Sequence, residues 1–140
     1  MADAFAKIKI GYVQDRSGQV LRNDLVETLN PGGEPSQPAY TLTIKIEEPQ
    51  RNLAFQRNNS VSFVSYSVIA YWSLADQNGS TVFSTYSSSS LQYAISNSQY
   101  ATAVNAQDAR DRVVLDISQD IRNQLARYFL SQRPTGQASK

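Results

Sequence analysis

The chain has 140 residues, and its 13 Lys and Arg residues against 12 Asp and Glu residues leave a net charge of +1. It contains no Cys and no His, which excludes disulfides, thiolate metal sites, thiol catalysis and any serine–histidine–aspartate triad. This length is enough for one domain with its own core, and the near-neutral charge gives no general attraction to nucleic acid or to an anionic membrane.

The first third of the chain predicts a strand, a helix and a loop. Residues 6–13 alternate apolar and polar side chains in their first half, which is typical of a short strand. A helix follows, capped by a side-chain oxygen of Asp15 or Ser17 and ending near Asn30, where a Pro-Gly-Gly sequence begins an irregular loop. Its apolar positions stand four residues apart on one face: Leu21, Leu25 and Leu29.

Three strands are predicted in the middle of the chain. Tyr40–Glu48 alternates cleanly, and residues 60–75 form a longer strand whose inward phase changes, so we expect a β-bulge near Phe63 and Val64. The Asn-Gly pair after Asp76 predicts a hairpin turn. The return strand then runs from residue 80 to 86 or, more loosely, to 95, and its four consecutive serines suit an edge strand.

The last element is a helix of about 30 residues that begins near Ser98 and ends at about Leu130. Its apolar stripe comprises Val104, Val113 or Val114, Ile117, Ile121, Leu125 and Tyr128. Asp108, Asp111, Asp116 and Asp120 alternate with arginines, which indicates a solvated face and not a metal or acid–base site.

The predicted fold class is α+β, in the order β-α-β-β-β-α. Two helices pack on one face of a small, about four-stranded mixed or antiparallel sheet. We expect a single domain over residues 1–132 and a disordered tail over 133–140, because the tail has no apolar periodicity.

The segment from Asn58 to Gln107 is nearly free of charge, since Asp76 is the one charged residue among 50. It combines Ser, Thr, Asn and Gln with eight aromatic residues, a composition that favours an interface because such side chains are cheaper to desolvate than charges. A hairpin whose outer face merely uses strand-compatible Ser and Thr is the alternative. The candidate partner-binding residues are Ser62, Tyr66, Tyr71, Asn78, Phe83, Ser84, Tyr86 and Ser87.

Basic groups near one aromatic residue form a second candidate site. Arg51 and Arg57 bracket Phe55 at even spacing, which suits contact with an anionic lipid head group, although solubilising arginines on a linker are the simpler interpretation. The aromatic residues otherwise lie where no cation would meet a phosphate, so we expect no nucleic acid partner. We expect no catalytic residue, cofactor or metal: no glycine spacing matches a phosphate loop.

Two passages resemble a known family. Residues 10–25, IGYVQDRSGQVLRNDL, continuing to Leu29-Asn30-Pro31, resemble the first strand and helix of the lipopolysaccharide-assembly lipoprotein family (LptE type), in a branch seen in alphaproteobacteria. Residues 98–101, SQYA, before a charged helix that ends in residues 125–129, LARYF, resemble its C-terminal helix. The likeness extends from about Ile8 to Leu130.

The resemblance implies a non-enzymatic lipoprotein at the periplasmic face of the outer membrane. Such a protein is lodged in the lumen of a β-barrel partner (LptD type) that inserts lipopolysaccharide into the outer leaflet. The family's anchor is an N-terminal lipidated cysteine, which this chain lacks, so we expect it to have been removed together with a signal peptide. The alternative from composition is a secreted or periplasmic carbohydrate- or glycolipid-binding module, with a carboxylate enzyme third.

Overall fold

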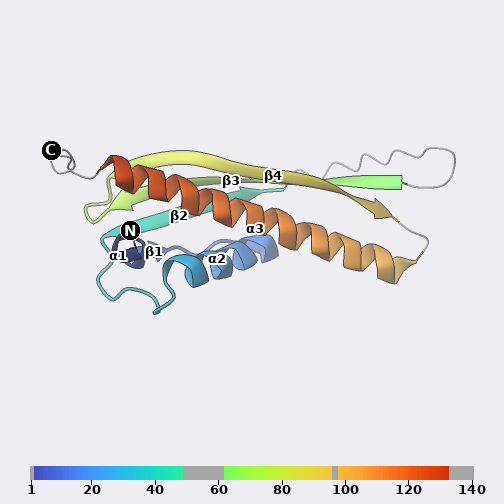
Figure 1. The fold of residues 1–140 in the computed structure, drawn as a ribbon, viewed down its shortest axis with the longest axis horizontal. Coiled ribbons are helices and arrows are strands. Elements are labelled where there is room, and N and C mark those ends of the chain that lie inside the picture. Colours follow the sequence, from blue (N-terminus) through green and yellow to red (C-terminus); the bar gives the residue numbers. More distant parts are fainter. Residues whose placement is uncertain (1, 49–61, 96–97, 133–140) are drawn as a thin grey trace.

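The fold was analysed in a computed structural model that describes residues 2–48, 62–95 and 98–132 (Figure 1). The elements in chain order are α1 (Ala2–Ala6), β1 (Ile8–Ile10), α2 (Asp15–Leu29), β2 (Tyr40–Glu47), β3 (Ser62–Asp76), β4 (Thr81–Ile95) and α3 (Gln99–Ser131). The α+β class and the predicted order are confirmed, with α1 added in front.

The four strands form one mixed sheet in the order β1-β2-β3-β4. β1 runs parallel to β2, whereas the β2–β3 and β3–β4 pairs are antiparallel. The hairpin between β3 and β4 turns where the Asn-Gly pair predicts it: Gly79 has a φ of 84°. The Asp76 carboxylate accepts hydrogen bonds from the backbone N–H groups of Asn78 (2.9 Å) and Ser80 (3.0 Å).

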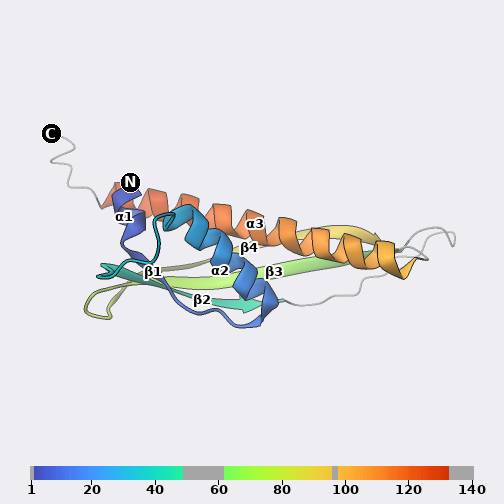
Figure 2. The ribbon, with the colours of Figure 1, turned by 90° about the horizontal axis from the view of Figure 1, so that it is seen from below.

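Both long helices cover the same face of the sheet. Every second residue of β3 from Tyr66 to Leu74 is buried in one core with the leucines of α2 and with the Val113–Leu125 stripe of α3. α3 lies on one side of the strands in Figure 2, and no helix in the described part of the chain packs against the other side of β3 and β4. No helix of the described residues has the length and apolar character needed to cross a membrane.

The short helix α1 was not predicted, because residues 2–6 have no helical periodicity of their own. Contacts from distant elements hold it: the Asn30 side-chain amide donates to the Phe5 carbonyl (3.2 Å), and the rings of Phe5 and Phe129 meet edge to face at 6.2 Å. These contacts bring the start of the chain to the C-terminal end of α3 (Figure 1).

Three local predictions were wrong. The bulge lies near the turn and not near Phe63: Leu74 pairs with Phe83 and Ala75 with Thr81, which leaves Val82 as the extra residue. Neither Asp15 nor Ser17 caps α2. Its N-cap residue is Gln14, whose side chain makes no capping hydrogen bond.

The third wrong prediction places Val104 on the apolar stripe of α3, whereas Val104 is 47% exposed. The contact face of α3 at this end passes instead through Asn105, whose amide donates to the Ala94 carbonyl (3.1 Å), and through the buried Ala109. The predicted start of α3 near Ser98 is confirmed, and the structure adds a cap there: the Ser98 hydroxyl accepts a hydrogen bond from the Ala101 N–H (3.1 Å).

Candidate partner-binding face

The side of the β3–β4 hairpin that faces away from the helices is open and uncharged. Since side chains alternate along a strand, the residues between the buried positions of β3 and their register partners on β4 point away from the core. We call this set the outer hairpin face: Phe63, Ser65, Ser67, Ile69, Tyr71 and Ser73 of β3, with Ser84, Tyr86, Ser88, Ser90, Gln92 and Ala94 of β4.

Two tyrosines form the centre of the outer hairpin face. Tyr71 and Tyr86 are opposite each other in the register, with ring centroids 6.1 Å apart, and their side chains are 44% and 59% exposed. Lys45 of β2 is the register partner of Tyr71 on the other side. Large aromatic rings with polar tips suit a surface that exchanges water for a partner.

Hydroxyl groups surround the two tyrosines. Ser73 pairs with Ser84 in the row toward the turn, and further along the hairpin Ser67 pairs with Ser90. All of these groups can donate and accept hydrogen bonds without stranding a charge in an interface.

Three predicted partner-binding residues point into the molecule. Ser87 is buried and accepts a hydrogen bond from the Trp72 indole Nε1 (3.1 Å), so it stabilises the core and lies outside the exposed face. Phe83 is half-buried against Trp72, at a centroid distance of 5.5 Å. Tyr66 is also buried, at 9% exposure.

Strand alternation places adjacent predicted residues on opposite faces, and the unpaired Val82 sets which of them face inward. One extra residue in a strand moves every later side chain to the opposite face of the sheet. Beyond it Phe83 and Ser87 face inward, whereas Ser84 and Tyr86 face outward. Nothing in the sequence around Val82 distinguishes this position, so it was not predictable which residues of β4 face inward.

The remaining predicted residues fall at the two ends of the hairpin. Asn78 is exposed at the turn beside the outer hairpin face. Ser62 is the first residue of β3, and only its backbone is described. The predicted lipid-binding residues Arg51, Phe55 and Arg57 lie outside the described residues.

A polar cluster that the sequence reasoning missed joins α2 to the sheet. The Tyr66 and Ser17 hydroxyls both donate to the Glu48 carboxylate, the latter at 2.6 Å. Burial raises the pKa of the Tyr66 hydroxyl, and its bond to Glu48 adds to this. Because these residues are 18 to 49 positions apart in sequence, no local pattern reveals the cluster.

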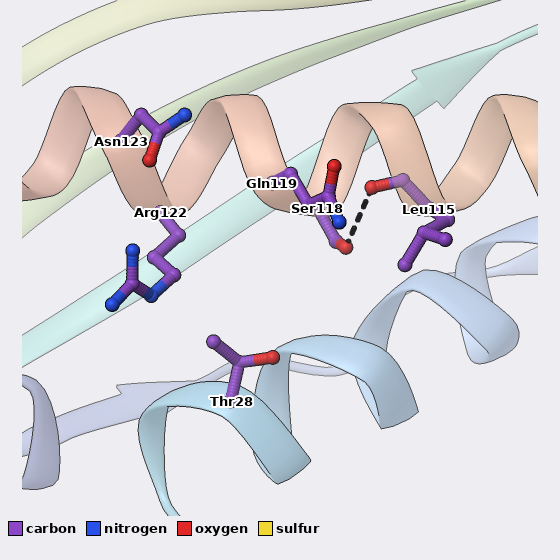
Figure 3. Close-up of a pocket in the computed structure, with 6 residues that line it drawn as sticks. All are labelled: Thr28, Leu115, Ser118, Gln119, Arg122 and Asn123. Carbon is purple, nitrogen blue, oxygen red and sulfur yellow. Dashed lines mark hydrogen bonds between the residues drawn. The ribbon is translucent and has the colours of Figure 1, made fainter.

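A pocket of about 360 Å³ lies in the helix layer, between α2 and α3 (Figure 3). It is lined by Thr28, Leu115, Ser118, Gln119, Arg122 and Asn123. Its cation, the Arg122 guanidinium, lies 5.7 Å from the centre of the Phe5 ring. Asp24 lies one turn before Thr28 in α2. Burial and the carboxylates of Glu27 and Asp111 raise its pKa. These acids oppose an anionic ligand, so we assign none.

The comparisons with known proteins give the family. The sequence profile described as lipopolysaccharide-assembly LptE matches residues 5–131, nearly the whole chain. This chain belongs to the LptE family. A search of curated proteins gives no match.

Solved structures of bacterial lipoproteins share the LptE fold of this chain. A Caulobacter crescentus protein described as a lipoprotein superposes with a TM-score of 0.80 at 22% identity, covering 95% of this chain and 97% of its own. The rare lipoprotein B of Shewanella oneidensis superposes with a TM-score of 0.66 at 8% identity, and the match covers 91% of this chain and 98% of that protein. A minor lipoprotein of Acinetobacter baumannii superposes with a TM-score of 0.61 at 13% identity, and the match covers 89% of this chain and 94% of that protein. At these identities the likeness establishes the fold alone.

Proposed function

We propose that this LptE-family protein is a non-enzymatic lipoprotein of the outer membrane, held at its periplasmic face. It occupies the lumen of a β-barrel partner (LptD type), assists the assembly of that barrel, and helps it to insert lipopolysaccharide into the outer leaflet. Two features support the proposal together: the family match over residues 5–131 and the open, uncharged outer hairpin face.

The outer hairpin face is the contact with the barrel in this proposal. A barrel lumen is lined with polar groups, and a plug must exchange hydrogen bonds with them while water is displaced. Seryl hydroxyls and tyrosine tips make that exchange at low cost, whereas each unpaired charge buried there is expensive. Tyr71 and Tyr86 are the most exposed aromatic residues of the face, as expected of an interface anchor.

Lipopolysaccharide contact remains a proposal for Arg51, Phe55 and Arg57. A guanidinium pair can bind phosphate in a forked geometry, and a neighbouring ring adds apolar surface for the lipid. The prediction is that an Arg51→Ala/Arg57→Ala double variant binds labelled lipopolysaccharide more weakly than wild type, with the difference shrinking at high salt. Equal binding by both proteins would move the site elsewhere.

A carbohydrate-binding module is the second candidate, favoured by one specific observation. Lys45, Tyr71 and Tyr86 stand in one cross-strand row on an open sheet face, so a sugar ring can stack on a tyrosine while the ammonium binds a phosphate or carboxylate. This candidate requires the isolated domain to bind soluble anionic oligosaccharides without any barrel.

Co-purification separates the two candidates. The barrel partner is expressed with a tagged version of this protein, and the retained barrel is measured for wild type and for a Tyr71→Ala/Tyr86→Ala variant. The assembly role predicts a stoichiometric complex that the double variant loses. Failure of the wild-type protein to retain the barrel, combined with glycan binding that the same double variant abolishes, would replace the assembly role with the carbohydrate-binding one.

A further inference from the structure

One edge of the sheet lacks the usual protection against pairing with another chain. β4 is the outermost strand, runs for 15 residues and contains no charged residue, proline or glycine. Its outer edge is visible along the top of the sheet in Figure 1, and no strand of the described residues lies beyond it. Edge strands of native proteins are normally short, or carry charges, prolines or bulges along the exposed part, because their open N–H and C=O groups pair readily with other chains.

The opposite edge of the same sheet has that protection. β1 is only three residues long, and Lys9 at its centre is exposed. Where β1 ends, the neighbouring part of β2 carries the exposed charges of Lys45 and Glu47. The protein therefore limits pairing at one edge and leaves the other uncharged, which indicates that the β4 edge has a use.

Two contacts from α3 identify which backbone groups of β4 point outward. The Asn105 amide donates to the Ala94 carbonyl at 3.1 Å, and the Gln124 amide approaches the Tyr86 carbonyl at 3.5 Å. Within a strand, the N–H and C=O of one residue point to the same side, and alternate residues repeat that direction. The outward-pointing set therefore includes Ser88, Ser90 and Gln92, which lie between the two contacts.

The segment from Ser88 to Gln92 is open. All three side chains of the outward set are exposed, and within the described part of the chain no residue outside the sheet bonds to their backbone groups. α3 thus covers the β4 edge at Tyr86 and at Ala94 and leaves the stretch between them available for pairing.

We infer that the β4 edge from Ser88 to Gln92 pairs with an extended, uncharged segment of the barrel partner, by β-strand addition. This inference rests on the proposed function and specifies how the partner is bound. The side chains of the outward set belong to the outer hairpin face, so a strand added at the edge extends the same contact surface. Backbone hydrogen bonds supply affinity in this mode of recognition, and alternate side chains supply specificity.

Charge disfavours a second copy of this chain as the occupant. α3 runs beside β4 and carries two carboxylates there. The Asp116 carboxylate accepts a hydrogen bond from the Ser89 hydroxyl (3.1 Å), and the Asp120 carboxylate accepts one from the Gln124 amide (2.7 Å). Antiparallel pairing of two β4 edges about Ser90 would bring the Asp116 carboxylates of the two copies toward each other. Like charges at such a contact oppose association.

Adjacent proline substitutions test the edge. Proline at position 90 removes an N–H that points outward, so Ser90→Pro is expected to fold and to lose about tenfold or more in barrel binding, the loss expected from one or two backbone hydrogen bonds. Ser89→Pro is the matched control, because its N–H points toward β3 and its loss is expected to lower the melting temperature. Binding is measured by co-purification titration with the intact barrel.

Amide exchange on the wild-type protein keeps the test decisive even when a proline variant fails to fold. The amides of Ser88, Ser90 and Gln92 are expected to exchange quickly in the free protein and slowly in the barrel complex. Unchanged exchange, or wild-type binding by a folded Ser90→Pro, overturns the inference. Protection that grows with this protein's own concentration assigns the edge to a second copy and also overturns it.

One further variant separates this inference from the proposed function. Ser84→Asp places a charge on the outer hairpin face, away from the open edge. Loss of the barrel by Ser84→Asp together with wild-type binding by Ser90→Pro rejects edge pairing alone. Wild-type binding by both variants rejects the proposed function as well.

Discussion

Gly18 in α2 is expected to behave oppositely to an ordinary helical glycine. Replacing a glycine inside a helix by alanine normally stabilises the helix, by up to about 1 kcal/mol. At position 18, however, a Cβ atom would lie 2.5 Å from Val13 Cγ1 and 3.1 Å from Val13 Cβ. Val13 is buried and β-branched, so its side chain has little freedom to move away.

The magnitude follows from these two opposing effects. Overpacking of a core costs about 1–3 kcal/mol, which exceeds the helix-propensity gain, so Gly18→Ala should lower the free energy of unfolding by about 1 kcal/mol. In a chain of this length that corresponds to a fall of about 4 °C in melting temperature. Urea unfolding followed by circular dichroism measures the change, and Gln19→Ala at the exposed neighbouring position is the control.

A double-mutant cycle with Val13→Ala tests the cause. Removing Val13 Cγ1 eliminates the 2.5 Å contact and leaves the 3.1 Å contact to Cβ, so Gly18→Ala should cost clearly less in the Val13→Ala background than in wild type. A Gly18→Ala variant that is more stable than wild type would refute the packing argument, as would equal effects in the two backgrounds.

Three further variants probe the core and the polar clusters. Ser87→Ala leaves the buried Trp72 indole N–H without its acceptor and should cost about 1–2 kcal/mol in urea unfolding, whereas an exposed serine on β4 should cost less than about 0.5 kcal/mol. Asp24→Asn should raise stability at neutral pH by about 0.5 kcal/mol, because burial and neighbouring carboxylates raise the Asp24 pKa. The native state then holds this proton more tightly than the unfolded chain, so the advantage of the variant should vanish as the pH falls and Asp24 becomes protonated. Tyr66, whose pKa is also raised, makes the native state lose stability as the pH rises above about 10, and Tyr66→Phe should reduce that loss in a pH-dependent melting series.

Much of the fold was predictable because its local signals agree with the tertiary structure. The alternation in Tyr40–Glu47, the Asn-Gly turn after Asp76 and the four-residue leucine spacing of α2 each determine a local conformation that the packed molecule keeps. The predictions that were wrong or missing at the start of the chain concern features that distant contacts determine. α1 is held by Asn30 and Phe129, and the Ser17 hydroxyl bonds to Glu48 instead of capping its own helix.

The candidate site was predictable as a region but not residue by residue. The absence of charge from residue 58 to residue 107 identifies the hairpin, and Tyr71, Ser84 and Tyr86 lie on its open face. The direction of each side chain on β4 depends on the unpaired Val82, for which the sequence gives no sign. For the same reason the outward set at Ser88, Ser90 and Gln92 appears only once the register is known.

Binding of the barrel partner by a charge-bearing variant is the most direct test of the central claim, that the outer hairpin face is the contact surface. Ser84→Asp is compared with Gln119→Asp, which adds the same charge at an exposed position of α3 in the helix layer. Both variants should keep the stability of wild type to within about 0.5 kcal/mol. The account predicts that Ser84→Asp loses the barrel while Gln119→Asp retains it at the wild-type yield; retention by Ser84→Asp, or loss by Gln119→Asp alone, would contradict it.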